Sequence, residues 1–176
     1  MSVQLHDKTF DLFLTSSEIQ ARISEVCEYL NRDYADKRPV FIAILNGSFM
    51  FAADVMRRFN DACEIQFVRL ASYVGTSSTG EVQTILGLSA DLKGRHVVIL
   101  EDIIDSGETM VSFLPLLAQK EVASCQICSF LVKPDALKHP IDVAYRCFDI
   151  PNEFVVGYGL DYDGLGRNLP DVYHLH

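Results

Sequence analysis

The stretch that decides the fold is "VVILEDIIDSGETM", which runs from Val97 to Met110. Its first four residues are apolar, and a continuous apolar run of this kind predicts a strand that is buried on both faces. The residues after the Ser106-Gly107 pair are spaced as in a helix, over roughly 109–120. Three carboxylates, Glu101, Asp102 and Asp105, lie between strand and helix. Carboxylates beside a buried strand are costly unless they are solvated, paired or bound to a metal, so we expect this turn to hold something.

A second strand–turn–helix unit lies nearer the start of the chain. The apolar run "PVFIAIL" (39–45) ends in Asn46-Gly47-Ser48, and a helical pattern follows to Phe59. Further strands are expected over 64–72, 82–88 and 124–132, with one more inside 153–162. Another helix is expected to start at a Ser17 cap, with Gln20 closing a capping box. Alternating strands and helices predict an α/β domain with a largely parallel sheet, whose ligands bind beyond the carboxyl ends of the strands.

Composition limits the possible partners. The 176 residues suit one domain, 1–176, and 49% hydrophobic with 22% charged residues excludes bulk disorder. Because 15 Lys and Arg face 24 Asp and Glu, the net charge of −9 argues against nonspecific nucleic-acid binding. No apolar stretch approaches the roughly 18–20 residues that span a bilayer, and the first residues do not resemble a secretory signal. We therefore expect a cytoplasmic protein with neither a nucleic-acid nor a membrane partner.

The five cysteines are odd in number and scattered, as is usual for reduced thiols. Cys125 and Cys128 form a C-x-x-C within the strand predicted over 124–132. Residues three apart on a strand point to opposite faces of a sheet. The pair is therefore predicted to pack in the core and to form neither a disulfide nor a metal site.

The acidic turn has the chemistry of a sugar-phosphate site. The start of a helix presents free backbone N–H groups that attract phosphate, Gly107 permits close approach, and Ser106 and Thr109 add hydroxyls. Glu101 and Asp102 can accept hydrogen bonds from the hydroxyls of a ribose or bind magnesium. On these residues alone, a solvated acidic loop with a helix cap stays an alternative.

The stretch "EDIIDSGET" (101–109) resembles the signature of the type I phosphoribosyltransferases, in the form found in the hypoxanthine-guanine branch. Ser106 stands where Thr is usual, and other family landmarks follow over roughly 40–169. The resemblance implies a central, mostly parallel sheet flanked by helices, with a small hood formed by the terminal segments. It also implies a homodimer or homotetramer. The implied reaction transfers the 5-phosphoribosyl group of phosphoribosyl pyrophosphate to a 6-oxopurine (hypoxanthine, and guanine too), with Mg²⁺ as cofactor, and gives IMP or GMP and pyrophosphate.

The resemblance assigns roles within the signature. Asp105 is the implied general base at N7 of the purine. Glu101 and Asp102 are implied to hold the ribose and, together with Asp161, the magnesium ion. The 5′-phosphate is implied to bind Ser106, Gly107, Glu108 and Thr109.

Two further loops match the family. Asn46-Gly47 matches a loop that contacts pyrophosphate and contains a non-proline cis peptide bond; many members have Lys or Arg at the position of Asn46. The segment "ASYVGTSSTGEV" (71–82), with Ser72-Tyr73 near its start, matches a lid that closes over the active site. Its small, polar residues independently suggest a lid that excludes water, although an ordinary hairpin loop has the same composition.

The purine pocket is implied by "LVKPDAL" (131–137) and by the segment 148–170. Lys133 is implied to donate to the 6-oxo group, and an ammonium, which can only donate, favours a keto base over adenine. Phe154 is implied to stack on the base and Val155 to bind its edge through the backbone. Arg167 is implied to bind pyrophosphate. Without the motif, Phe154 would be read as core, and the three charged side chains Lys133, Asp161 and Arg167 as surface residues.

Three alternatives remain at this point. A phosphoribosyltransferase could prefer xanthine or another base. A regulator that senses phosphoribosyl pyrophosphate could use the same fold, but it would need a basic face for nucleic acid. A magnesium-dependent sugar-phosphate hydrolase is a third possibility, for which the sequence offers no separate pair of residues to activate water.

Overall fold

Strand β3 (Val40–Leu45) lies at the centre of the molecule, and its side chains alternate between two cores. The computed structural model describes residues 1–72, 82–88 and 91–176. Phe41 and Ala43 pack on one face of the sheet, whereas Ile42 and Ile44 pack on the other. A strand covered on both faces needs apolar residues throughout, which explains the continuous apolar run.

In the described ranges the main sheet has the order β5-β4-β3-β6-β7-β8. Five of these strands run parallel, and β5 pairs antiparallel with β4 at one edge. The predicted strands are confirmed, and β8 is an additional one. Their bounds are β4 (Glu64–Ser72), β5 (Val82–Leu86), β6 (His96–Ile104), β7 (Ser124–Val132) and β8 (Tyr145–Asp149).

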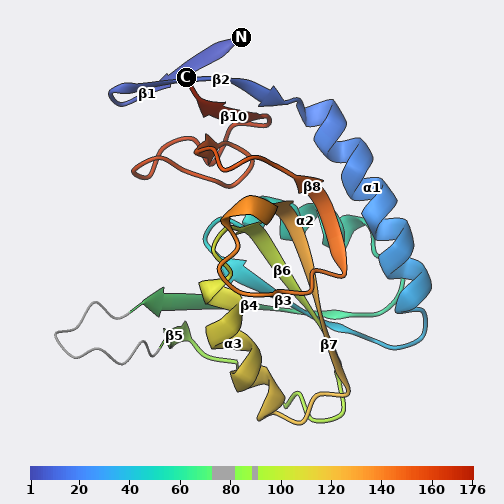
Figure 1. Cartoon of the computed structure of the whole chain (residues 1–176). Helices are drawn as coiled ribbons and strands as arrows, with labels where there is room; N and C mark the ends of the chain where they lie inside the picture. Colours follow the sequence, from blue (N-terminus) through green and yellow to red (C-terminus); the bar gives the residue numbers. More distant parts are fainter. Residues whose placement is uncertain (73–81, 89–90) are drawn as a thin grey trace, which may run out of the picture.

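Helices cover both faces of this sheet, as predicted (Figure 1). Helices α1 (Ser16–Asp33) and α2 (Phe49–Arg58) pack on one face, and α3 (Glu108–Ala118) packs on the other. A short 3-10 helix, η1 (Pro134–Ala136), follows β7. The two cysteines of the C-x-x-C lie on opposite faces of the sheet, as predicted, because Cys128 belongs to the first core whereas Cys125 packs against the second.

The predicted cap of the first helix was wrong by two residues. Thr15 is the N-cap: its hydroxyl accepts from the backbone N–H of Glu18, and the Glu18 carboxylate accepts from the Thr15 backbone N–H. Gln20, the residue expected to close the box, instead donates to Asp54 on α2. Two overlapping capping patterns occur in this sequence, and the one that forms leaves the Gln20 side chain available for its contact with Asp54.

The two terminal segments form a second, antiparallel sheet with the order β1-β2-β10-β9. This is the small hood that the resemblance implied, and Figure 1 shows it above the carboxyl ends of the main strands, with both chain ends on it. Phe10, Val156 and Tyr173 form its own small core. The strands are β1 (Ser2–Leu5), β2 (Lys8–Leu14), β9 (Val155–Val156) and β10 (Val172–Leu175).

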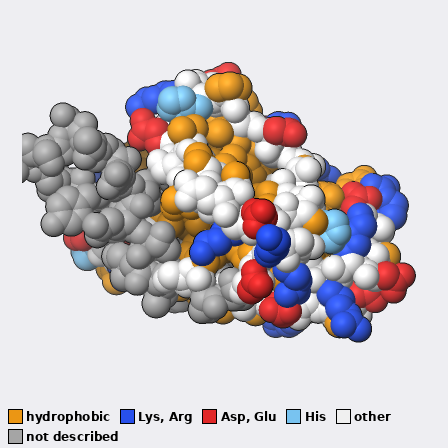
Figure 2. All heavy atoms as spheres, turned by 90° about the horizontal axis from the view of Figure 1, so that it is seen from below, with side chains coloured by type: hydrophobic (Ala, Val, Ile, Leu, Met, Phe, Trp, Pro, Cys, Tyr) orange, Lys and Arg blue, Asp and Glu red, His pale blue; other side chains and the backbone are white. Residues whose placement is uncertain are grey.

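Figure 2 shows one face of the molecule, seen from below. Hydrophobic side chains gather near its centre, and toward one end the Lys and Arg residues lie beside Asp and Glu. None of the helices in the described ranges is long and apolar enough to cross a membrane.

Candidate active site

Parallel pairing brings the predicted site residues to one edge of the main sheet. In the register, Ile104 of β6 lies opposite Val132 of β7. Asp105 and Lys133, which follow these two residues, therefore leave neighbouring strands at the same level. The Lys133 backbone N–H donates to the Ile104 carbonyl at 2.9 Å, which fixes the two turns against each other.

The turn after β6 encloses a cavity of about 80 Å³ in front of helix α3. Gly107 caps this helix with a φ of +82°, a conformation that L residues with side chains rarely adopt. A Cβ at Gly107 would also lie 2.9 Å from the Ile141 side chain. The first turn of this 11-residue helix contributes Thr109 and Met110 to the cavity lining, and the N–H groups of a first turn have no partners within the helix, which suits a phosphate. The cavity is lined by Glu101, Ile103, Ile104, Asp105, Ser106, Gly107, Thr109 and Met110.

Glu108 is the one residue of the predicted phosphate turn that does not line this cavity. Its carboxylate pairs with Lys138 at 3.1 Å, and both side chains are exposed. Its backbone N–H lies 3.4 Å from the Ser106 hydroxyl. Glu108 can therefore serve the turn through its backbone rather than through its side chain.

Asp105 and Lys133 form an ion pair at the entrance to this turn. The Lys133 ammonium donates to an Asp105 carboxylate oxygen at 2.8 Å. The Lys133 side chain is only 8% exposed whereas that of Asp105 is 52% exposed, so the base candidate is open to a ligand. The structure thus brings the predicted base and the predicted purine donor into direct contact.

Glu101 and Asp102 form an unusual acidic pair on β6. Glu101 is buried, and its Oε2 atom has no hydrogen-bond partner in the part of the chain that the structure describes. Burial, together with the adjacent Asp102 carboxylate, raises the pKa of Glu101 well above its usual value. Burial also raises the pKa of Asp102, although hydrogen bonds from Glu101 and the Ile103 N–H and the charge of Arg167 act against it. An unpaired buried carboxyl oxygen beside a second carboxyl suits a hydroxyl or a cation.

The loop after β3 contacts this acidic pair. The peptide bond between Leu45 and Asn46 is cis, as the resemblance implied, and the Asn46 side chain is exposed. A Cβ at Gly47 would lie only 1.5 Å from an Asp102 carboxylate oxygen. Only glycine permits this approach between the predicted pyrophosphate loop and the predicted ribose and metal site.

The C-terminal segment closes the other side of the same loop. A Cβ at Gly159 would lie 2.0 Å from the Gly47 carbonyl oxygen. Arg167 donates to the Gly159 carbonyl at 2.7 Å and pairs with Asp161 at 2.6 Å. Gly47, Asp102, Asp161 and Arg167 are therefore gathered into one charged cluster.

Phe154 and Val155 occupy the base of the hood. Phe154 is 47% exposed, and its ring lies 6.2 Å from the Phe10 ring and 5.9 Å from the Tyr162 ring. Val155 is buried and pairs with His174 of β10. A half-exposed aromatic ring packed beside two others is suited to stacking with a planar base.

The predicted lid lies largely outside the described residues. Ser72 ends β4, whereas Tyr73 and the residues up to 81 are not described.

Sequence reasoning missed several residues that build the site, among them Lys138, Ile141, Gly159 and Tyr162. Of these, only Gly159 had a signal, since glycines flank Tyr158 in "GYG" (157–159). The others act through contacts between distant segments, which a single sequence does not reveal.

Comparison with known proteins agrees with this geometry. The phosphoribosyl transferase domain family matches residues 13–163. The hypoxanthine-guanine phosphoribosyltransferase of Staphylococcus aureus is 41% identical over 169 residues, which cover 96% of this chain and 94% of that protein. The enzyme of the same name from Streptococcus pneumoniae is 39% identical over 162 residues, covering 92% and 90% of the two chains.

Solved structures give the same result. A hypoxanthine phosphoribosyltransferase from Staphylococcus aureus superposes with a TM-score of 0.89 at 41% identity, covering 94% of this chain and 91% of that one. A hypoxanthine-guanine phosphoribosyltransferase from Bacillus anthracis, solved with HEPES in its active site, also has a TM-score of 0.89, at 33% identity, covering 94% of this chain and 98% of that one.

The chain therefore belongs to the phosphoribosyltransferase family, and it is an enzyme of that class. Its resemblance to the hypoxanthine-guanine branch, first indicated by residues 101–109, is confirmed by relatives that carry that name.

Proposed function

We propose that the protein transfers the 5-phosphoribosyl group of phosphoribosyl pyrophosphate to a 6-oxopurine, hypoxanthine and also guanine, as a step of purine salvage. The observation that carries the proposal is the meeting of three separate segments at one sheet edge. These are the phosphate turn after β6, the Lys133–Asp105 pair, and the cluster of Gly47, Asp161 and Arg167. In the proposal they would form the 5′-phosphate, purine and pyrophosphate sites of one active site.

The reaction exchanges one bond at the anomeric carbon of the ribose. N9 of the purine forms a bond to this carbon while the bond to the pyrophosphate oxygen breaks, with inversion, and the purine loses a proton. In the proposal Asp105 accepts that proton at N7 and the Lys133 ammonium donates to the 6-oxo group, and the ion pair between them supports these roles by bringing the two groups together. Because the transition state resembles an oxocarbenium ion, the site must also hold the ribose, through Glu101 and Asp102, and the departing pyrophosphate, through Arg167 and the backbone of Asn46-Gly47.

Magnesium fits the residues present. Mg²⁺ prefers oxygen ligands, and the buried Glu101 Oε2 atom, which lacks a partner among the described residues, lies beside the Asp102 carboxylate. The Asp161 carboxylate is a further oxygen donor. It pairs with Arg167, which in turn donates to the Gly159 carbonyl next to the loop after β3. The described residues hold no group of three or more His, Cys, Asp or Glu arranged around one point. That arrangement suits an ion whose remaining ligands are substrate oxygens and water, and which, when bound, offsets the pyrophosphate charge. Activity should therefore vanish in excess chelator and return with added magnesium.

Assay of the purified protein with phosphoribosyl pyrophosphate and magnesium tests the proposal directly. Hypoxanthine, guanine, xanthine and adenine are supplied one at a time, and nucleotide formation is measured. IMP and GMP formation with little AMP is the expected result. A much higher kcat/KM for xanthine would favour the xanthine-preferring alternative, and no nucleotide with any base would refute the proposal. The net charge of −9 favours an enzyme over a nucleic-acid-binding regulator, which would need a basic face.

A homodimer or homotetramer and a cytoplasmic location are part of the proposal. One relative, the hypoxanthine phosphoribosyltransferase of Trypanosoma cruzi, was solved in a study of how its C-terminal region affects oligomeric state and activity. Light scattering during size-exclusion chromatography measures the assembly of the present chain. All five cysteines are free, which supports a reducing compartment.

A further inference from the structure

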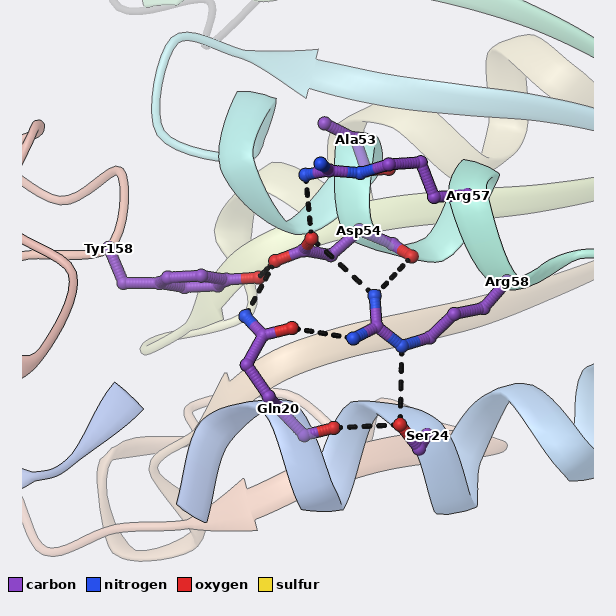
Figure 3. Close-up of polar contacts among 7 residues, drawn as sticks. All are labelled: Gln20, Ser24, Ala53, Asp54, Arg57, Arg58 and Tyr158. Atoms are coloured by element: carbon purple, nitrogen blue, oxygen red, sulfur yellow. Dashed lines mark hydrogen bonds and ion pairs between the residues drawn. The ribbon is translucent and has the colours of Figure 1, made fainter. Parts of the chain in front are cut away.

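Asp54, on helix α2, is a buried carboxylate that lies outside the charged clusters described above. Its residue is only 7% exposed. Its two carboxylate oxygens accept from the Tyr158 hydroxyl at 2.6 Å, from the Gln20 amide at 2.8 Å and from Arg57 at 2.8 Å. Arg58 completes the cluster by donating to the Asp54 carbonyl and to the Gln20 side chain. Figure 3 shows these side chains converging from α1, α2 and the C-terminal segment.

The Tyr158–Asp54 hydrogen bond joins a neutral donor to a charged acceptor. Burial opposes ionisation of Asp54, but hydrogen bonds from Gln20 and Tyr158 and the charges of Arg57 and Arg58 outweigh it, so the pKa of Asp54 is lowered. Burial and the bond to Asp54 both raise the pKa of Tyr158. Hydrogen bonds with one ionised partner are stronger than neutral ones, particularly when shielded from water.

The backbone at Tyr158 needs such an anchor. Tyr158 has a φ of +48°, and the flanking Gly157 and Gly159 have φ values of +97° and +101°. A residue with a side chain is seldom found there, and it stays there only when its surroundings hold it. The buried Tyr158 ring packs 4.7 Å from the Phe130 ring, and its N–H donates to the Leu169 carbonyl at 2.9 Å.

The next residue, Gly159, contacts both Gly47 and Arg167, so the position of Tyr158 affects the pyrophosphate side of the site. Gly159 meets the Gly47 carbonyl so closely that no side chain fits between them. Its own carbonyl accepts from the Arg167 guanidinium, and its N–H donates to the Arg167 carbonyl at 3.0 Å. A shift of Tyr158 would therefore displace both Arg167 and the loop after β3.

The purine side of the same segment is held by different contacts. Val155 and Val156 pair with β10, and Phe154 lies against Phe10 and Tyr162 of the hood. Loss of the Tyr158 hydroxyl should leave these contacts in place.

We propose that Tyr158 and Asp54 are positioning residues that hold the C-terminal segment on α2, so that Gly159 and Arg167 face the pyrophosphate group. Their effect is selective for phosphoribosyl pyrophosphate over the purine. This inference rests on the proposed function and assigns a role in it to residues that touch no substrate.

The Tyr158→Phe variant tests the proposal, because it removes one hydroxyl and keeps the ring. We expect the KM for phosphoribosyl pyrophosphate to rise about tenfold, the KM for hypoxanthine to change less than twofold, and kcat to change little. The matched control is Tyr145→Phe, which removes a tyrosine hydroxyl bonded to Asp33 at 2.9 Å, between β8 and α1. It should lower thermal stability by a similar amount without changing either KM.

Two variants of Asp54 test its role as the hydrogen-bond acceptor of Tyr158. Asp54→Asn keeps an oxygen that can accept from Tyr158, whereas Asp54→Ala keeps none. The KM for phosphoribosyl pyrophosphate should rise less in Asp54→Asn than in Asp54→Ala. Equal increases in the two variants would show that loss of packing or charge, rather than the hydrogen bond, explains the change.

Hydrogen exchange measured by mass spectrometry gives a readout independent of activity. The amides of 157–160 should exchange faster in Tyr158→Phe than in the wild type, and in Tyr145→Phe they should not. Unchanged exchange, an equal rise in both KM values, or a change confined to kcat would overturn the proposal. An inactive wild-type protein would instead refute the proposed function, and the exchange measurement would still test the anchor.

Discussion

The Lys133 ammonium donates to an Asp105 carboxylate oxygen at 2.8 Å, although the two residues are 28 positions apart in the chain. They meet because β6 and β7 are parallel neighbours and each residue directly follows the end of its strand. In the proposed reaction these two groups would act on the same purine, Lys133 at the 6-oxo group of its six-membered ring and Asp105 at N7 of its five-membered ring. Binding of a base between them would let Lys133 exchange a carboxylate for the 6-oxo group.

Asp105→Asn should reduce kcat by about 10²–10⁴, because the amide cannot accept the N7 proton. The affinity for the product nucleotide, measured by calorimetry, should change far less, since Asn keeps a similar shape. Asp135→Asn, on the exposed η1 turn, is the control and should retain full activity. Near-normal kcat in Asp105→Asn would remove the general-base role.

Lys133→Met should weaken selection of the 6-oxo group, because Met has a similar length and no donor. A hydrogen bond to a charged group contributes about 1.5–3 kcal/mol, so kcat/KM for hypoxanthine should fall about 10- to 100-fold. The ratio of kcat/KM for hypoxanthine to that for adenine measures the effect. If this ratio is unchanged, Lys133 does not read the 6-position.

Gly47→Ala should disable the pyrophosphate loop, since the added Cβ would overlap an Asp102 carboxylate oxygen 1.5 Å away. A displacement of about 1 Å at a reacting centre can cost about 10²-fold, and we expect a fall of that size in kcat/KM for phosphoribosyl pyrophosphate. Gly87→Ala is the matched control, because its Cβ would meet none of the described residues within 4 Å. Equal activities of the two variants would contradict the close contact.

Asp54 should make the stability of the protein depend on pH in acid. Its pKa in the folded state lies below the usual value of 3.8. A lowered carboxyl pKa contributes stability above the unfolded pKa, and this contribution is lost as the pH falls through the folded pKa. Asp54→Asn should therefore be less stable by about 1–3 kcal/mol at pH 7, and the difference should shrink below pH 3.8. Urea unfolding at several pH values measures it, and a pH-independent difference would show that packing dominates.

Much of the main sheet could be predicted from the sequence, because its strands are buried on both faces and read as continuous apolar runs. Strand β1 gave no such signal, since its residues alternate between exposed and half-buried. Among the described strands it pairs with β2 alone, and the small sheet depends on β10, more than 150 residues later in the chain. Pairing between distant short segments is a tertiary property, so the family resemblance, and not the pattern, predicted the hood.

The candidate site likewise has a part that could be predicted from the sequence and a part that could not. The functional residues of the turn at 101–109 are adjacent in the sequence, so this part of the site could be predicted. The role of Asp54 could not be predicted, because a single acidic residue on an amphipathic helix is usually solvated. Its partner Tyr158 lies 104 positions away, and only the fold brings them together. The assigned roles of Glu101, Asp102, Asp161 and Arg167 stay predictions until their variants are assayed.

The order of strands in the hood has a consequence for synthesis of the chain on the ribosome. Strand β10 lies between β2 and β9, so the two earlier strands have no shared neighbour until residues 172–175 have emerged. The main sheet, complete in sequence by Asp149, can assemble before that point. A nascent chain would thus acquire its phosphate turn early and its base-stacking platform last. Emergence of residues 172–175, rather than folding of the central sheet, would then mark the moment at which the enzyme becomes able to select a purine.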